Sequence, residues 1–376
     1  MIAGTLVLFI AFYMLYPTLP LFIQEMGGND AQVGLSMGAF MLSSVIFRPI
    51  VGGLLDRFGR RPFIVFGLLL FIAAMYMYNW LAGIVALLAL RTLHGLSWAL
   101  TSTATQTAVT DMIPPARRGE GLGWLGMSMT LAMAVGPTLG LWFTDNLSYH
   151  ALFLTGVVLS SITLLLTFGA EMPFRPQANA GRIEVVEKSV VPLSIAVFFL
   201  FAAYGGITTF VPLFAASLQV NSGSFFLVYA TTLAVTRPLA GRLSDRYSET
   251  AVVIPALMVT IAALIALSLS SGLWGLLGSA ALYGIGFGSA HPVLHAATIR
   301  LARAERIGAA NATFTTAVDL GIGLGAIILG WVVQYTSYRG LFMVSAASVA
   351  ICLLVFTLVK HMLAEGALPS ETTDAA

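Results

Sequence analysis

Apolar residues occur along this chain in long blocks rather than in alternating or amphipathic patterns. A block of about 20 residues is the length of an α-helix that crosses a hydrocarbon layer about 30 Å thick. A closed barrel, the other structure that spans a bilayer, would show short alternating strands instead. The pattern therefore predicts an all-α membrane protein with twelve transmembrane helices, at residues 2–24, 31–54, 62–80, 82–109, 121–143, 149–170, 191–215, 222–243, 250–270, 272–298, 308–333 and 338–359.

The connections between these blocks are short except for one near the middle of the chain. Residues 171–190 contain prolines, a glycine and charges of both signs. This composition predicts a cytoplasmic linker between an N-terminal six-helix bundle at residues 1–170 and a C-terminal bundle at residues 191–361. Residues 362–376 have the composition of a disordered tail.

A short charged phrase occurs twice in the chain. "RPIVGGLLDRF" begins at Arg48 and "RPLAGRLSDRY" at Arg237, with six of eleven positions identical. The separation between positions 48 and 237, which we call the repeat interval, also relates Gly95 to Gly284, Arg117 to Arg306, and Gly136 to Gly325. Each copy contains six predicted helices, and six crossings return the chain to the side of the membrane where it started. Both copies therefore have the same orientation in the membrane. We therefore predict two pseudo-symmetric bundles related by an axis along the membrane normal.

Composition and charge agree with this architecture and exclude several classes of protein. Charged residues make up 9% of the chain, against about 25% in soluble globular domains. Most of the Lys and Arg residues lie on the side of the linker, whereas Arg339 lies on the opposite side. The positive-inside rule then predicts that both termini are cytoplasmic, in a multi-pass protein of a bacterial inner membrane. The single cysteine, Cys352, allows no intrachain disulfide, and the dispersed basic residues do not favour nucleic-acid binding.

Three motifs resemble those of the major facilitator superfamily, most closely its twelve-span drug:proton antiporter branch. "GGLLDRFGRR" at Gly52–Arg61 matches the superfamily's loop motif G-x-L-x-D-R-x-G-R-R. "RTLHGLS" at Arg91–Ser97 resembles the motif with a membrane-embedded arginine. "AMAVGPTLG" at Ala132–Gly140 resembles the antiporter motif G-x-x-x-G-P-x-x-G-G, although Ala132 and Leu141 replace its first and last glycines. The match covers nearly the whole chain.

The resemblance implies a gating latch at the cytoplasmic side. The family's aspartate, here Asp56, faces the positive N-terminus of the eleventh helix, and the family's arginines pair with an acid that we expect to be Asp111. Such a latch would favour the outward-open state; the alternative is a solvated basic loop. The predicted gating residues are Gly52, Asp56, Arg57, Gly59, Arg60, Arg61, Asp111, Asp245, Arg246, and Gly136 and Pro137 of the small-residue face and bend in the fifth helix.

Two ionisable residues are predicted near the middle of the membrane. Asp319 lies about eleven residues into its helix, or about 17 Å at 1.5 Å per residue. Ionisable groups at that depth are costly and are functional by default. We predict proton coupling by Asp319 with Arg91 and His94, against the alternative of a structural acid. Arg48 and Arg237 lie closer to the cytoplasmic edge, where snorkelling is an equal alternative to function.

Aromatic and histidine side chains on the first, fourth, seventh and tenth helices are candidates for substrate contact. The predicted substrate-binding residues are Tyr13, Tyr16, Trp98, Tyr204, Phe210, Tyr283, His291 and His295. Aromatic residues also pack between helices, so simple packing is the alternative for each. His291 and His295 stand at i and i+4 on one helix face, but no third ligand is evident, so no bound metal is expected.

These observations predict a secondary active transporter, a proton-coupled antiporter that exports small amphipathic organic solutes by alternating access. An importer or uniporter of a small metabolite or sugar, and an exporter of metal chelates, are the alternatives. The chain shows no nucleotide-binding loop, zinc-protease motif or nucleophile constellation, so we expect no enzyme activity and no cofactor. The expected partners are the solute, protons and the lipid bilayer, and we expect a monomer.

Overall fold

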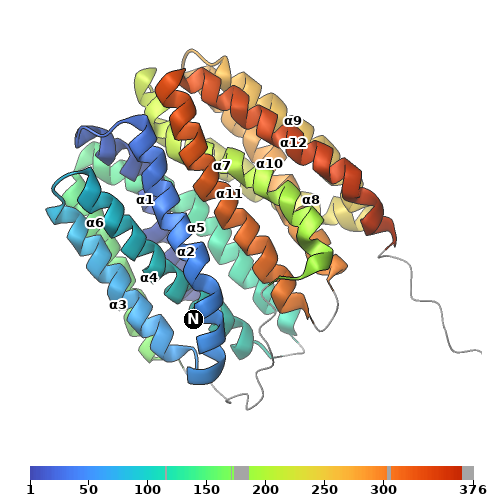
Figure 1. Cartoon of the computed structure of the whole chain (residues 1–376), viewed down its shortest axis with the longest axis horizontal. Coiled ribbons are helices and arrows are strands. Elements are labelled where there is room, and N and C mark those ends of the chain that lie inside the picture. Colours follow the sequence, from blue (N-terminus) through green and yellow to red (C-terminus); the bar gives the residue numbers. More distant parts are fainter. Residues whose placement is uncertain (115–116, 171, 173–185, 303–305, 366–376) are drawn as a thin grey trace, which may run out of the picture.

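The computed structural model describes residues 1–114, 117–170, 172, 186–302 and 306–365, and these residues form two six-helix bundles (Figure 1). The predicted linker and tail lie largely outside this range. The described α-helices are α1 (Ile2–Glu25), α2 (Asp30–Phe58), α3 (Arg61–Met77), α4 (Ile84–Met112), α5 (Arg118–Asn146), α6 (Tyr149–Phe168), α7 (Val191–Ser217), α8 (Ser222–Arg246), α9 (Glu249–Ser268), α10 (Leu273–Leu301), α11 (Ile307–Tyr335) and α12 (Tyr338–Glu365).

The predicted helices are confirmed, with ends within about four residues except at the end of α12, which continues to Glu365. Within the described part of the chain, 11 helices are long and apolar enough to cross a membrane. Helix α8 is the exception because it is more polar and carries Arg237, Arg242 and Arg246. Its polarity is the first sign that α8 faces protein or water along part of its length.

The internal repeat is confirmed by the helix bounds. Helices α7, α10, α11 and α12 begin one repeat interval after α1, α4, α5 and α6, at positions 191 and 2, 273 and 84, 307 and 118, and 338 and 149. The repeated glycines also make equivalent contacts. A Cβ on Gly95 would meet the carbonyl of Phe40, and one on Gly284 would meet the carbonyl of Tyr229, which is the repeat counterpart of Phe40. Close approach of these helix backbones requires glycine in both bundles.

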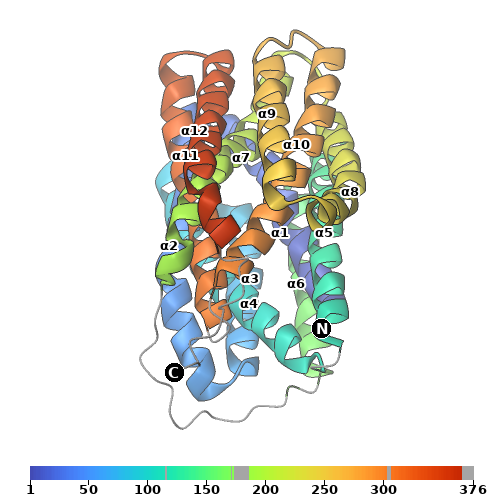
Figure 2. The ribbon, with the colours of Figure 1, turned by 90° about the vertical axis from the view of Figure 1, so that its right-hand side faces the viewer.

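The two bundles meet along α2 and α11 and along α5 and α8, which Figure 2 shows on opposite sides of the molecule. We call the end where residues 170 and 186 leave the bundles the linker end, and the opposite end the far end. Near the far end, a Cβ on Gly34 would lie 2.3 Å from the carbonyl oxygen of Ala326, and one on Gly330 would lie 2.8 Å from that of Asp30. The bundles are therefore in backbone contact at the far end.

Side-chain hydrogen bonds also join the two bundles at the far end. At the far end, the Tyr338 hydroxyl donates a hydrogen bond to Asp30 Oδ1 at 3.0 Å, and Asn221 Nδ2 donates to Asp145 Oδ2 at 2.8 Å; both bonds join the two bundles. At the linker end, the ion pairs between described residues lie within one bundle, as in the pair Arg300–Glu249 at 2.6 Å. The described contacts thus close the far end.

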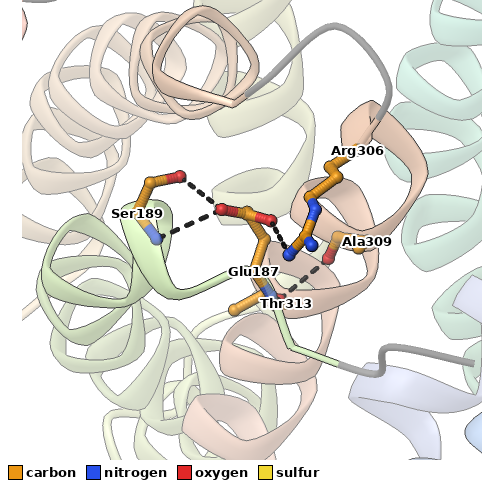
Figure 3. Close-up of polar contacts among 5 residues, drawn as sticks. All are labelled: Glu187, Ser189, Arg306, Ala309 and Thr313. Atoms are coloured by element: carbon orange, nitrogen blue, oxygen red, sulfur yellow. Dashed lines mark hydrogen bonds and ion pairs between the residues drawn. The ribbon is translucent and has the colours of Figure 1, made fainter.

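The last residues of the linker are anchored to the start of α11 (Figure 3). Glu187 is buried, its Oε1 accepts hydrogen bonds from the hydroxyl and amide of Ser189, and its Oε2 lies 3.3 Å from Arg306 Nη1. The Glu187 amide donates to Thr313 Oγ1 at 3.0 Å, while that hydroxyl donates to the Ala309 carbonyl. Ser189, followed by Arg306, holds the pKa of Glu187 below its usual range.

We predict that Glu187→Gln lowers the Tm at pH 7 and that the Tm difference from wild type shrinks as the pH falls below about 4.3, the ordinary pKa of a glutamate. The sign follows from the lowered pKa of Glu187 in the folded state. A lowered pKa means that the carboxylate stabilises the fold above the unfolded-state pKa, and that this contribution is lost on acidification. Thermal unfolding in detergent across this pH range checks it, with the exposed Glu25→Gln as control. Equal Tm values for Glu187→Gln and wild type at pH 7 would contradict the anchor.

Candidate functional site

An ion pair between the two bundles lies deep in the predicted membrane interior. Arg48 Nε of α2 lies 2.8 Å from Asp319 Oδ2 of α11, and the two side chains are 15% and 9% exposed. Asp319 stands twelve residues into α11, which places it about 18 Å along the helix. The sequence singled out Asp319 but did not identify Arg48 as its partner, and it left Arg48 open between snorkelling and function.

The ion pair offsets the free-energy cost of burying two charged side chains. Removing either charge from water is expensive, and the attraction between the two ions offsets that cost only while both are present. Protonation of Asp319 would leave Arg48 without a counter-charge at this contact. The interaction that joins α2 to α11 in mid-membrane is therefore one that a single proton can weaken.

An equivalent contact recurs between α8 and α5, but there the arginine has a neutral partner. Arg237 is the repeat counterpart of Arg48, and Thr130 is the repeat counterpart of Asp319. Arg237 Nη1 donates a hydrogen bond to Thr130 Oγ1, across the two bundles, and Arg237 Nη2 lies 3.4 Å from His291 Nδ1. The repeat thus places an arginine at both interfaces but a titratable acid at only one of these two positions.

Arg91 and His94 lie within the N-terminal bundle instead of joining Asp319. Arg91 Nε donates to the Ser36 carbonyl at 3.2 Å, and its guanidinium lies 4.3 Å from the centre of the Phe40 ring. His94 Nδ1 lies 3.0 Å from the Tyr78 hydroxyl. The structure therefore does not bring the three predicted proton-coupling residues into direct contact, and the roles of Arg91 and His94 stay predictions.

Tyr13 and Tyr16 stand one turn apart on α1, with ring centres 5.3 Å apart. Helix α1 contacts α7 of the C-terminal bundle as well as α5 of its own. A substrate-contacting role for either tyrosine stays a prediction.

The other predicted aromatic residues are all buried in the core of the bundles. Tyr204 and Tyr283 each stack on Phe287, with ring centres 4.8 and 5.6 Å apart. Trp98 stacks on Phe12 at 3.7 Å, and Phe210 packs against Gly330. For all four the structure favours the packing alternative.

Tyr229 of α8 belongs to this aromatic group, although the sequence analysis did not select it. Its ring centre lies 5.7 Å from that of Tyr283. Within the described part of the structure, the buried hydroxyl of Tyr283 has no hydrogen-bond partner. The internal repeat could have identified Tyr229 from the sequence, because Tyr229 is the repeat counterpart of Phe40. The Phe40 ring lies against the Arg91 guanidinium.

The two histidines of α10 do not form a metal centre. His295 Nε2 lies 2.8 Å from Asn311 Oδ1, and His291 lies beside the cationic Arg237. No group of three His, Cys, Asp or Glu side chains that could hold a metal ion occurs among the described residues. A guanidinium next to His291 also disfavours a second cation there.

The loop motif forms a network within the N-terminal bundle. Arg60 Nε lies 2.8 Å from Asp111 Oδ2, so the expected pairing is present, and Arg61 Nη2 donates to the Phe168 carbonyl at 2.6 Å. Gly59 ends α2 with φ 83°, a conformation that favours glycine. The side chain of Asp56 lies outside the described residues. Gating by this network stays a prediction.

The remaining gating candidates are on the surface or in the packing of α5. Arg57, Asp245 and Arg246 are exposed at the linker end, and Gly52 is partly buried with open space around its Cα. A Cβ on Gly136 would lie 2.6 Å from Tyr13 Cβ, so this glycine lets α5 approach α1. Pro137 stands next to it within α5.

Comparison with known proteins identifies the family. The sequence matches the model for the Major Facilitator Superfamily over residues 1–231 and 193–374. The staphylopine export protein of Staphylococcus aureus is 25% identical over 95% of this chain and 94% of its own length. The multidrug resistance protein MdtG of Citrobacter koseri is 26% identical over 90% and 88%.

Solved structures share the fold at lower sequence identity. A bacterial homologue of the human lysosomal transporter Spinster, in an inward-facing, unoccupied conformation, superimposes with a TM-score of 0.79 at 15% identity, covering 98% of this chain and 97% of that one. The human organic anion transporter MFSD10 gives a TM-score of 0.73 at 19% identity, with 94% and 97% coverage.

We predict that Arg48→Gln lowers the free energy of unfolding by about 3 kcal/mol because it leaves Asp319 buried without its counter-ion. The double variant Arg48→Gln/Asp319→Asn is expected to recover most of that loss, since no uncompensated charge remains. Unfolding measurements on the single and double variants in lipid nanodiscs check this coupling. Additive effects of the two substitutions would contradict a direct interaction.

Proposed function

This chain belongs to the major facilitator superfamily, and we propose on that basis that it exports a small amphipathic organic solute in exchange for protons. Its relatives are transporters rather than enzymes, and two of them are named for multidrug resistance and for staphylopine export. These names support outward transport. The chain is accordingly proposed to work as a monomer in the lipid bilayer of a bacterial inner membrane.

The observation that carries the proposal is the Arg48–Asp319 ion pair between the bundles. A proton-coupled carrier needs a group whose charge changes within the membrane and whose change alters a contact between its moving parts. Asp319 meets both requirements, because it is buried and because its partner belongs to the other bundle. Proton binding would weaken this contact, whereas proton release would restore it.

The positions of the contacts support a cytoplasm-facing state. The positive-inside bias assigns the linker end to the cytoplasm. The described inter-bundle hydrogen bonds at Asp30 and Asp145, and the glycine contacts of α2 with α11, lie at the far end. In the proposed cycle this end opens to take up a proton and release solute, and the linker end opens to release the proton and bind solute. Solute and proton then favour different states and weaken each other's binding reciprocally.

The loop motif is proposed to stabilise the opposite, outward-open state. Arg60 and Asp111 already hold the ends of α2 and α4 together. With that end of the N-terminal bundle preorganised, closing the linker end requires only that α11 approach it. The glycine contact of α5 with α1 supports tight packing of a helix that moves with its bundle.

Export of a metal chelate is the second candidate. The similarity to the staphylopine export protein over 95% of this chain motivates it. Equal binding of the metal-free and metal-loaded forms of a candidate chelator, measured by equilibrium dialysis, would count against this alternative and leave the first proposal standing.

We predict that Asp319→Asn abolishes solute accumulation driven by a pH gradient in inverted vesicles while leaving solute exchange without a gradient within about twofold of wild type. The neutral side chain cannot bind and release a proton, whereas the route for the solute remains. A panel of lipophilic drugs and organic acids provides the test solutes, and Glu25→Gln removes an exposed carboxylate as control. Unchanged gradient-driven uptake by Asp319→Asn would exclude Asp319 as the coupling residue, and uptake in the importing direction would favour a symporter.

A further inference from the structure

Arg237 of α8 carries a charge that the structure does not neutralise. Its counterpart Arg48 pairs with Asp319, but Arg237 faces the hydroxyl of Thr130. Among the described residues Arg237 makes no ion pair, and its Nε is buried without a hydrogen-bond partner. A guanidinium is always protonated in proteins. The C-terminal bundle therefore presents a permanent positive charge at membrane depth.

The groups around Arg237 are suited to an anion rather than to a cation. Nη1 and Nη2 are directed to Thr130 and His291, both of which are neutral hydrogen-bonding partners. The side chains of Arg237, Thr130 and His291 are all partly exposed, as a solute-binding role requires. The planar guanidinium matches a carboxylate with two parallel hydrogen bonds, and such charge-assisted bonds are the strong ones.

A buried aromatic cluster adjoins this charge within the C-terminal bundle. Along α8 and α10, Tyr229 and Tyr283 lie two helical turns toward the far end from Arg237 and His291. Phe287 lies between the two levels and stacks on Tyr204 and Tyr283. All four rings are buried, so they pack against one another beside the cation.

We propose that Arg237, with Thr130 and His291, binds the carboxylate of the transported solute. The solute is thereby assigned to the class of amphipathic organic anions. This inference rests on the proposed transport function and specifies its substrate class. The Arg48–Asp319 interface is left free for the proton, because α2 and α11 form the other side of the contact between the bundles.

A matched pair of ligands tests the charge requirement. The affinities of naphthalene-2-carboxylate and naphthalene-2-carboxamide for the full chain in phosphatidylcholine nanodiscs are measured at a fixed pH of 7.5 and without a gradient. Wild type is expected to bind the carboxylate at least about tenfold more tightly than the amide, which equals about 1.4 kcal/mol. Equal affinities would overturn the proposal. Because no proton gradient is used, the result is independent of the role of Asp319.

Two substitutions test whether Arg237 is the source of the preference for the carboxylate over the amide. Arg237→Gln should remove it by weakening carboxylate binding about tenfold or more, with amide binding unchanged as evidence of an intact fold. Thr130→Asp recreates at this interface the acid that Asp319 supplies at the other, so it should neutralise Arg237 and abolish the preference without removing the arginine. Arg242→Gln removes an exposed arginine from the same helix and should retain the preference. Retention in both Arg237→Gln and Thr130→Asp would overturn the assignment.

Anionic lipid is the remaining source of an anion. The same measurement in phosphatidylglycerol nanodiscs should leave the carboxylate preference of wild type unchanged. Loss of that preference only in phosphatidylglycerol would assign Arg237 to a lipid headgroup and overturn the solute site.

Discussion

The buried carboxyl of Asp319 needs a counter-charge in the membrane interior, and this requirement organises the interface between α2 and α11. Arg48 and Asp319 satisfy it only when α2 and α11 are close enough for a 2.8 Å contact. Gly323, one turn from Asp319, provides that proximity, because a Cβ there would lie 2.8 Å from Met41 Cβ of α2. The backbone packing and the ion pair therefore depend on each other.

Helix α11 connects three parts of the molecule. Its first turns hold the end of the linker through Arg306 and Thr313, its middle carries Asp319, and its last turns pack against α2 through Gly330. A change of charge at Asp319 thus acts on a helix that is fixed at both ends to elements outside its own bundle core. This arrangement suits a helix whose position relative to α2 determines which end of the protein is open.

The internal repeat supplies two equivalent interfaces, which the side chains make different. Arg48 and Arg237 occupy the same position in each repeat, whereas Asp319 corresponds to Thr130. Under our proposals one interface responds to a proton and the other receives an anionic solute. Separation of the two functions requires only this single acid-to-hydroxyl difference on an otherwise shared framework.

The sequence by itself determined the twelve helices, the parallel repeat and the family resemblance, because block length, the constant repeat interval and the loop motif are all local or linear properties. It also identified Asp319 from its depth, since an acid in an apolar block is conspicuous without knowledge of its neighbours. Its partner Arg48, the Arg237–Thr130 contact and the location of Arg91 and His94 within one bundle were decided by the tertiary structure. Each of these depends on which faces of two distant helices meet, and apolar blocks without a polar face carry no periodic signal of that orientation.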